Sequence, residues 1–201
     1  MPSAQPTTAK RAQVQAAVLR TTEELLAAGN SYADLKVERI ATGAGISRTA
    51  FYFYFRDKRE LLMRLTEHVA EVLYTEADSF FTHEGDRTEE IRSALTSITG
   101  VYREHGPLLR AIVEVSTYDE EIARIWRALL QRFADATTRR VEREREAGQV
   151  PDIDVAATAF ALVWMTERTC YQELVQGRED GEALIEAMTG IWVRGLYGAR
   201  S

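Results

Sequence analysis

The sequence predicts an all-α protein of about nine helices in two parts, a small N-terminal head and a larger body. Apolar residues recur every three or four positions over most of the 201 residues, as they do along one face of a helix. The five aromatic residues 51–55 could pass for a strand, but Phe51 and Phe55 stand four residues apart and share a helical face. A composition of 45% hydrophobic and 28% charged residues is ordinary for a globular protein with a good core.

Composition and motifs exclude several kinds of protein. The one cysteine, Cys170, can form neither a disulfide framework nor a cysteine metal site, which fits a reducing cytoplasm. Residues 1–8 lack the apolar core of a signal peptide, and the longest apolar run, 155–165, is too short to span a membrane. The three histidines have no metal-binding spacing, and there is no nucleophile elbow. We therefore expect a cytoplasmic protein that uses no cofactor and is not an enzyme.

The head is predicted over residues 9–57, after a disordered tail of residues 1–8 that is rich in Pro, Ser and Thr. Its expected helices cover, in order, 8–28, 37–42 and a stretch that follows the N-cap Ser47. Gly43 and Gly45 suit the turn between the second and third helices, because glycine takes the left-handed conformation at little cost. The apolar residues expected in the core of the head are Val18, Leu25, Leu35, Ile40, Ala50, Phe51 and Phe55.

The third helix of the head has two contrasting sides at about 100° per residue. Its small and apolar side, suited to lie against another helix, carries Ser47, Ala50 and Phe51. The opposite side carries Arg48, Thr49 and Tyr52, whose groups suit guanine, a thymine methyl and a phosphate oxygen. This pattern is typical of the recognition helix of a helix-turn-helix. The alternative is a solvated face in a protein that never contacts nucleic acid.

The charge of the chain is divided unevenly. The net charge is −6, but residues 1–60 hold nine Lys and Arg against six Asp and Glu, while residues 61–201 hold 16 against 25. The head is therefore positive and the body negative, which would direct the head toward DNA. Lys10 and Arg11, at the start of the first helix, could lie in a minor groove or on phosphates, or they could simply be solvated.

A longer signature adds to this pattern. It runs through Ile40-Ala41, Gly45-Ile46-Ser47, residues 51–55 and Asp57-Lys58-Arg59-Glu60-Leu61-Leu62, and it resembles the N-terminal domain of the TetR/AcrR family of transcriptional regulators. The resemblance implies that Tyr52 and Lys58 contact phosphates and that Tyr54 lies near the DNA backbone. The residues expected to face DNA are Lys10, Arg11, Lys36, Val37, Ser47, Arg48, Thr49, Tyr52, Tyr54 and Lys58.

The body is predicted over residues 58–201. Its expected helices cover 58–81, 88–105, 108–115, 119–147, 153–175 and 180–197, with a polar break at 83–87. Asp152 or Asp154 should cap the helix over 153–175. Residues 139–146 alternate in sign and are expected to form a solvated face rather than a nucleic-acid patch.

The last two expected helices are apolar on more than one face. One face can complete the core of the body, and the other is most simply buried against a second subunit. In the TetR/AcrR family the last two helices form a four-helix dimer interface, so the resemblance also implies a homodimer. An obligate interface of this kind buries on the order of 2,000 Å² or more.

The body also suggests a ligand site, because all three tryptophans lie in it. Three of its segments, Ile122-Ala-x-Ile-Trp126, Met165-Thr-Glu-Arg-Thr169 and Ile191-Trp192-Val-x-x-Leu-Tyr-Gly198, resemble the EthR branch of the family, whose ligand channel is narrow, apolar and aromatic. The resemblance places Trp126, Trp192, Thr166 and Val163 at this channel. The large rings on the surrounding helices can line a long apolar cavity, which adds Tyr102, Phe133, Phe160 and Trp164 to the expected ligand site, with Tyr118 nearby. The alternative is that these rings are only core.

The expected ligand is elongated, hydrophobic and mostly uncharged. Thr166 stands where this branch has a polar amide that binds the ligand, and Val163 stands where it has a second amide, so this pocket should be less polar. Glu167 falls in mid-helix and is expected to be structural, paired with Arg110 or Arg168 because a buried carboxylate needs a partner.

The resemblance implies a homodimeric, sequence-specific DNA-binding regulator, by family habit a repressor, that a hydrophobic small molecule releases. Its operator would be a palindromic or pseudo-palindromic duplex with half-sites about 34–36 Å apart or a multiple of that. The alternatives are a helical small-molecule binding protein that does not bind DNA and an enzyme with an apolar pocket. No candidate catalytic group supports the enzyme.

Overall fold

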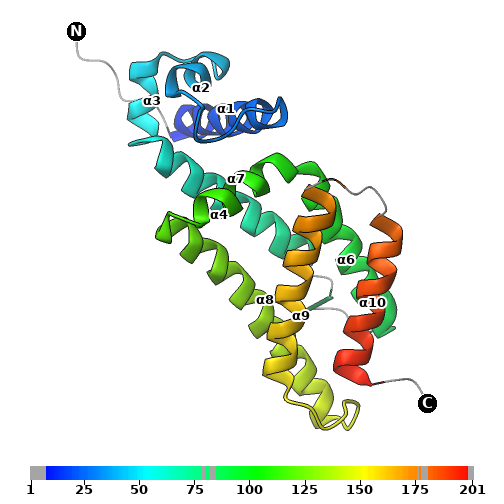
Figure 1. Ribbon diagram of the computed structural model, residues 1–201. Helices are drawn as coiled ribbons and strands as arrows, with labels where there is room; N and C mark the ends of the chain where they lie inside the picture. Colours follow the sequence, from blue (N-terminus) through cyan, green and yellow to red (C-terminus); the bar gives the residue numbers. More distant parts are fainter. Residues whose placement is uncertain (1–7, 78–79, 82–84, 176, 178–180, 199–201) are drawn as a thin grey trace.

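The computed structural model describes residues 8–77, 80–81, 85–175, 177 and 181–198, and over this part the protein is all-α, as predicted, with no strand. Figure 1 shows a small head, formed by the first three helices, above a larger helical body, with one long helix running from the first into the second. Residues 1–7 of the expected tail, residues 83–84 of the expected break and Asp180 lie outside the described part.

The head consists of α1 (Thr8–Ala27), α2 (Val37–Gly43) and α3 (Arg48–Tyr54). The expected caps form: the Ser47 hydroxyl accepts from the Ala50 N–H at 3.0 Å, and Gly45 has a φ of +70° in the turn before α3. The rings of Phe51 and Phe55 lie 5.3 Å apart and are both buried, so residues 51–54 form a helix and not a strand.

The core of the head differs from prediction in two of its three helices, α1 and α3. In α1 the buried leucine is Leu26, whereas Leu25 is only half-buried, because the inward side is set by Val18, Thr22 and Leu26 at four-residue spacing. Ala50 is also half-buried rather than part of the core.

Helix α4 (Lys58–Glu76) joins the head to the body. The Asp57 side chain accepts from the Glu60 N–H at 2.8 Å and so caps the helix. The helix ends five residues before the predicted end at Phe81, with Ala77 as its C-cap. Phe80 beyond it is buried, so the apolar pattern that suggested a longer helix comes from a residue that packs after the helix has stopped.

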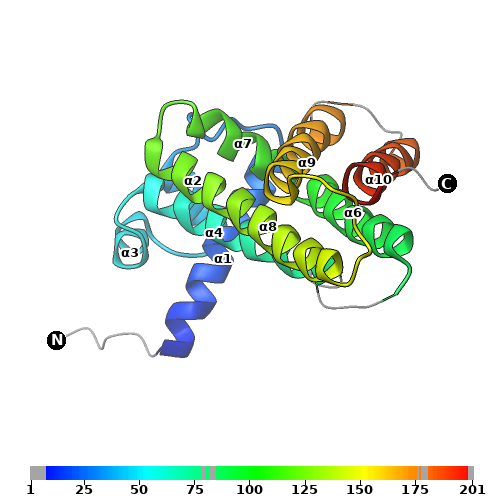
Figure 2. The ribbon, with the colours of Figure 1, turned by 90° about the horizontal axis from the view of Figure 1, so that it is seen from below.

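Within the described residues, the body adds five helices and one π-helical turn, arranged around α4. They are α6 (Arg87–Glu104), α7 (Gly106–Ser116), α8 (Glu120–Glu146), α9 (Val155–Cys170), the π-helical turn Tyr171–Val175 and α10 (Gly181–Tyr197). Helix α8 packs against α4 and α9, and α10 packs against α6 and α9. Both views place α9 and α10 side by side at one flank of the body, α10 being outermost (Figures 1 and 2). No helix in the described part is long and apolar enough to cross a membrane.

The α9 region selects one of the two predicted caps and corrects the predicted end of the helix. The N-cap is Asp154, whose carboxylate accepts from the Ala157 N–H at 3.0 Å, and Asp152 is not the cap. The α-helix gives way to a π-helical turn after Cys170 instead of continuing to Val175. Arg110 donates to the Val175 carbonyl oxygen at 2.5 Å, so it secures the end of this turn instead of pairing with Glu167.

The last turns of α8 are only in part the solvated face that the mixed charges predicted: Arg139, Arg143, Arg145 and Glu146 are exposed, but Arg140 is buried. Arg140 is only 5% exposed, because it lies one helical turn from the buried Ala136 and next to the buried Val141. Its guanidinium donates to the Phe80 carbonyl oxygen and to Glu90, and its Nε donates to Glu144 at 3.1 Å. This buried cation is therefore paired with two carboxylates.

Candidate nucleic-acid interface and ligand cavity

Helix α3 presents the side chains that the sequence predicted for base contact. Arg48 and Thr49 are exposed, and Tyr52 is 47% exposed, while Phe51 between them is fully buried. Ser47 is exposed as well, but its hydroxyl is used to cap α3. The buried Phe51 fixes the rotation of the helix, so the Arg48, Thr49 and Tyr52 side faces away from the core.

Of the remaining residues of the expected interface, some are exposed and others are half-buried. Lys10, Arg11 and Lys36 are exposed, and Val37 at the start of α2 is half-buried. Tyr54 is half-buried, and the Arg11 guanidinium lies 5.8 Å from the centre of its ring. The structure therefore brings the basic start of α1 to the end of α3, which sequence spacing did not predict.

Lys58 was expected to contact a DNA phosphate, but its ammonium is already hydrogen-bonded within the head. Its ammonium donates to the carbonyl oxygens of Tyr32, Ala33 and Leu35 at 2.7, 2.8 and 3.0 Å. An ammonium has three N–H donors, so all of them are used within the head. Burial lowers the pKa of this amine below its usual value. The side chain turns back along the α1–α2 loop from the start of α4, which is a tertiary contact that no local pattern encodes.

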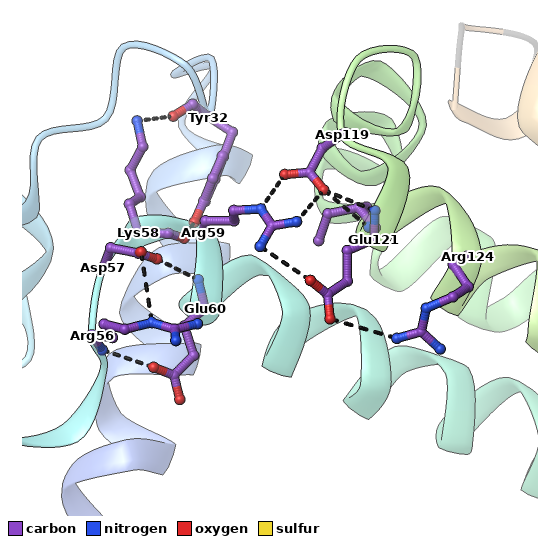
Figure 3. A network of polar contacts seen from close by, with 10 residues as sticks. Tyr32, Arg56, Asp57, Lys58, Arg59, Glu60, Asp119, Glu121 and Arg124 are labelled. Carbon is purple, nitrogen blue, oxygen red and sulfur yellow. Dashed lines mark hydrogen bonds and ion pairs between the residues drawn. The ribbon is translucent and has the colours of Figure 1, made fainter.

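Arg59, the residue after Lys58, links α4 to the N-terminus of α8 (Figure 3). The Arg59 guanidinium donates to the two carboxylate oxygens of Asp119 at 2.5 and 2.8 Å and pairs with Glu121 at 3.1 Å. Asp119 also caps α8, because one of its oxygens accepts from the Ile122 N–H at 3.3 Å. Hydrogen bonding to Arg59 holds the pKa of Asp119 below its usual value. The first turn of α4 is therefore tied to the start of α8.

A second polar contact joins α1 to α7. Nδ1 of His105, the residue before α7, lies 3.1 Å from the Glu23 carboxylate on α1. The hydrogen bond with Glu23 raises the pKa of His105 above its usual value. Since α1 belongs to the head and α7 to the body, this pair and the Arg59 pair hold the two parts together at separate points.

An apolar cavity of about 60 Å³, partly open to the surface, lies in the body between α4, α6, α8, α9 and α10. Its volume gives room for roughly four to six water-sized groups. Six of the eight residues expected at the ligand site line it, namely Tyr102, Trp126, Phe133, Val163, Thr166 and Trp192. Leucine, isoleucine and phenylalanine side chains from α4, α6, α8 and the segment after α4 complete most of the wall.

The other two expected ligand residues do not line this cavity. Phe160 is 48% exposed on the outer side of α9, and the Trp164 ring lies 5.9 Å from it. The two are four residues apart and share a side of the helix, and Trp164 lies about 100° around the helix from Val163, which faces inward. Tyr118 is 72% exposed in the loop before α8, so it also lies outside the cavity.

Some polar groups of the cavity wall have hydrogen-bond partners and others have none. The Trp192 indole N–H donates to the Thr166 hydroxyl at 2.8 Å. Among the described residues, the Trp126 indole nitrogen and both carboxylate oxygens of Glu167 have no hydrogen-bond partner. Glu167 is 4% exposed, and burial raises its pKa above the usual range of a carboxyl. The sequence prediction treated Glu167 as structural, although its place four residues after Val163 puts it on the cavity side of α9.

Two family models match the chain. Residues 18–65 match "Bacterial regulatory proteins, tetR family", and residues 91–198 match "Transcriptional regulator EthR, C-terminal domain". The HTH-type transcriptional regulator EthR of Mycolicibacterium smegmatis is 32% identical over 192 residues, which cover 92% of this chain and 86% of that protein.

Solved structures share the fold. The TetR-family regulator PfmR from Thermus thermophilus superposes with a TM-score of 0.70 at 20% identity, over 89% of this chain and 97% of that one. The structure of AibR in complex with isovaleryl coenzyme A and operator DNA gives a TM-score of 0.68 at 17% identity, over 93% of this chain and 100% of that one.

Proposed function

The chain belongs to the TetR family of bacterial transcriptional regulators, with a body of the EthR type, and on this basis we propose that it is a homodimeric repressor released by a hydrophobic small molecule. The observation that carries the proposal is the single helix α4. Its first turn is held in the DNA-binding head by Lys58, and Leu73 in its last turns and Ala77 at its C-cap line the cavity.

On the DNA side, the proposal assigns α3 to the major groove. The exposed Arg48, Thr49 and Tyr52 would contact the bases and the nearby backbone. Lys10, Arg11 and Lys36 would contact phosphates and so give binding its dependence on salt. Two such helices in a dimer match two half-sites about 34–36 Å apart or a multiple of that.

On the ligand side, the small volume of the cavity supports coupling between the two sites. A space of about 60 Å³ is small for an elongated effector, so we expect the surrounding helices to move apart when one binds. Movement of α8 would reach the first turn of α4 through the contact between Arg59 and Asp119, and Lys58 fastens that turn to the head. An effector that binds only the widened body would thereby favour head positions that fit the operator poorly. A solved protein of the same fold binds both a small molecule and operator DNA.

The dimer is assigned to the flank formed by α9 and α10. Phe160 on α9 is 48% exposed and Ile191 on α10 is 41% exposed, and Ala156 and Ala187 lie exposed on the same two helices. Large apolar side chains gathered on two adjacent helices favour burial against a second copy. This flank is the counterpart of the interface that the family resemblance implies.

The proposal is tested by fluorescence anisotropy with a labelled DNA fragment from upstream of the gene, together with random-library selection for other operators. The expected result is tight binding to one sequence over a random control, with an affinity that falls steeply as salt rises. Ligand binding without binding to any selected DNA at low salt would instead identify a small-molecule binding protein, and it would refute the repressor.

A further inference from the structure

We propose that the cavity recognises an elongated apolar molecule that carries one protonated amine, and that Glu167 is the residue that binds the ammonium. This inference rests on the proposed function, because it names the chemical class of the effector that the same cavity would take. It departs from the uncharged ligand that the sequence predicted.

The first observation is the state of the Glu167 carboxyl. The side chain is 2% exposed and lines the cavity, and neither of its oxygens makes a hydrogen bond of good geometry among the described residues. The nearest neutral donor is the Trp126 indole N–H, which lowers the pKa of the carboxyl against the larger effect of burial but supplies no counter-charge. Its one ion-pair contact there is with Arg168, whose Nε lies 3.7 Å away and whose side chain is 53% exposed. A contact of that length is too long for a hydrogen bond, and a solvated guanidinium compensates a buried charge poorly.

The buried ion pairs elsewhere in the body make a useful contrast. Glu90 and Glu144 are also largely buried, but each has one oxygen bonded to the guanidinium of Arg140. Arg140 therefore meets the rule that buried charges are paired. The buried carboxylate of Glu167 has no such buried cation beside it in the described part of the chain. One bound cation would be enough to pair its charge.

The second observation is the composition of the wall. Of the described residues that line the cavity, Glu167 is the only one with a charge, and no lysine or arginine is among them. The other polar contacts are internal, as in the bond from Trp192 to Thr166. The aromatic side chains in the wall are Phe80, Phe81, Tyr102, Trp126, Phe133 and Trp192, and the faces of such rings attract cations.

These features discriminate among ligand classes. An anionic head group would be repelled by the Glu167 carboxylate, because the described wall holds no cation to neutralise either charge. A neutral hydroxyl could donate to one oxygen but would leave the charge of an ionised carboxyl uncompensated. An alkylammonium supplies a counter-charge and up to three N–H donors for the two free oxygens, and charge-assisted hydrogen bonds of this kind are the strong ones. Its chain would extend along the apolar wall.

The test compares three probes of equal chain length, n-decylamine, n-decanol and n-decanoate, by isothermal titration calorimetry. At pH 8 the amine is protonated, because the usual pKa of an alkylammonium is about 10. We expect decylamine to bind the native protein at least about tenfold more tightly than decanol, with decanoate weakest. Equal affinity for decylamine and decanol, or no binding of decylamine, would overturn the inference.

Two variants test whether Glu167 causes the preference for decylamine over decanol. Glu167→Gln keeps the shape of the side chain and removes the charge, so the preference for decylamine over decanol should fall to about threefold or less. Glu114→Gln removes an exposed carboxyl from α7, outside the cavity wall, and should keep the full preference. A preference that survives in Glu167→Gln would show that another group binds the amine.

A parallel measurement separates this inference from the repressor proposal. The same probes are added to the protein bound to its selected operator. If decanol releases the DNA and decylamine does not, the repressor stands and the ammonium site is wrong. If decylamine binds with the expected dependence on Glu167 but no probe releases the DNA, the ammonium site stands and release by an effector is wrong.

Discussion

Tyr32 and Lys58 each bind the main chain of the other. The Lys58 ammonium donates to the Tyr32 carbonyl oxygen at 2.7 Å, and the Tyr32 hydroxyl donates to the Lys58 carbonyl oxygen. The ammonium also lies 5.1 Å from the centre of the Tyr32 ring. The loop between α1 and α2 is thereby fastened to the first turn of α4, so the head keeps a fixed direction relative to the helix that enters the body.

Replacing this lysine should therefore weaken the fold of the head rather than change its contact with phosphates. Lys58→Met removes three charge-assisted hydrogen bonds, and we expect the head to lose about 2 kcal/mol of stability. Chemical denaturation measures the loss. The slope of log affinity against log salt should stay the same, whereas Lys36→Met, in an exposed position, should reduce it by about one. A reduction of the slope by Lys58→Met would restore the role implied by family resemblance.

Arg48 should determine sequence preference. Arg48→Ala leaves the core of the head intact because the side chain is exposed, and we expect it to reduce discrimination at one base pair of each half-site by about 1–3 kcal/mol. Anisotropy with a set of singly substituted operators measures this. Uniform weakening on every sequence would assign Arg48 to a phosphate instead.

The contact between Arg59 and Asp119 should transmit the effector signal. Arg59→Met removes the ion pair but leaves Asp119 as the cap of α8, so folding, DNA binding and ligand binding should each persist. The change in DNA affinity caused by a saturating ligand should become smaller. Arg64→Met is the matched control, because Arg64 pairs only with Glu60 and Glu67 of its own helix in the described structure. An unchanged ligand effect in Arg59→Met would exclude this route.

Glu167 should make the unliganded protein less stable as pH rises. A carboxyl whose folded pKa is raised contributes most to stability below its unfolded pKa, and that contribution is lost as pH rises through the folded pKa. The native melting temperature should therefore fall relative to Glu167→Gln between about pH 4 and the folded pKa, and the difference should then level off. Parallel melting curves across pH measure this, and a constant difference would mean that the carboxyl is not perturbed.

The flank of α9 and α10 should hold the dimer together. Phe160→Glu places a charge on the exposed apolar side of α9, and we expect a monomer at micromolar concentration in analytical ultracentrifugation. Tyr118→Glu changes a side chain that is 72% exposed in the loop before α8, and it should leave the dimer intact. Dissociation by both variants, or by neither, would contradict the assignment.

Local signals in the sequence were enough to predict most of the fold. Ser47, Gly45 and the spacing of Phe51 and Phe55 fix α2, the turn and α3, because caps, left-handed glycine and helical periodicity act within a few residues. The boundaries were less predictable. The apolar Phe80 prolonged the pattern of α4 beyond its end, and a change to π-helical hydrogen bonding after Cys170 left no local signal.

Local signals also predicted only some residues of the candidate sites, because long-range contacts leave no local pattern. The exposed side of α3 follows from the rotation of one helix, and periodicity determines that rotation. The partners of Lys58 lie 23 to 26 residues earlier in the chain, and Arg59 lies 60 residues from Asp119, so neither contact could be read from spacing. Phe160 was misplaced because α9 is apolar on two sides, and periodicity alone cannot tell which side meets the cavity and which meets the outside.

The small volume of the cavity has a consequence for how much ligand would be needed. If the helices around a space of about 60 Å³ must part to admit a longer ligand, its apparent dissociation constant is the intrinsic constant divided by the fraction of molecules whose walls have already parted. The response threshold is then set partly by residues that never touch the ligand. Substitutions that loosen the packing of α4 against α8 would lower this threshold, and substitutions that tighten it would raise it, with the chemistry of recognition unchanged.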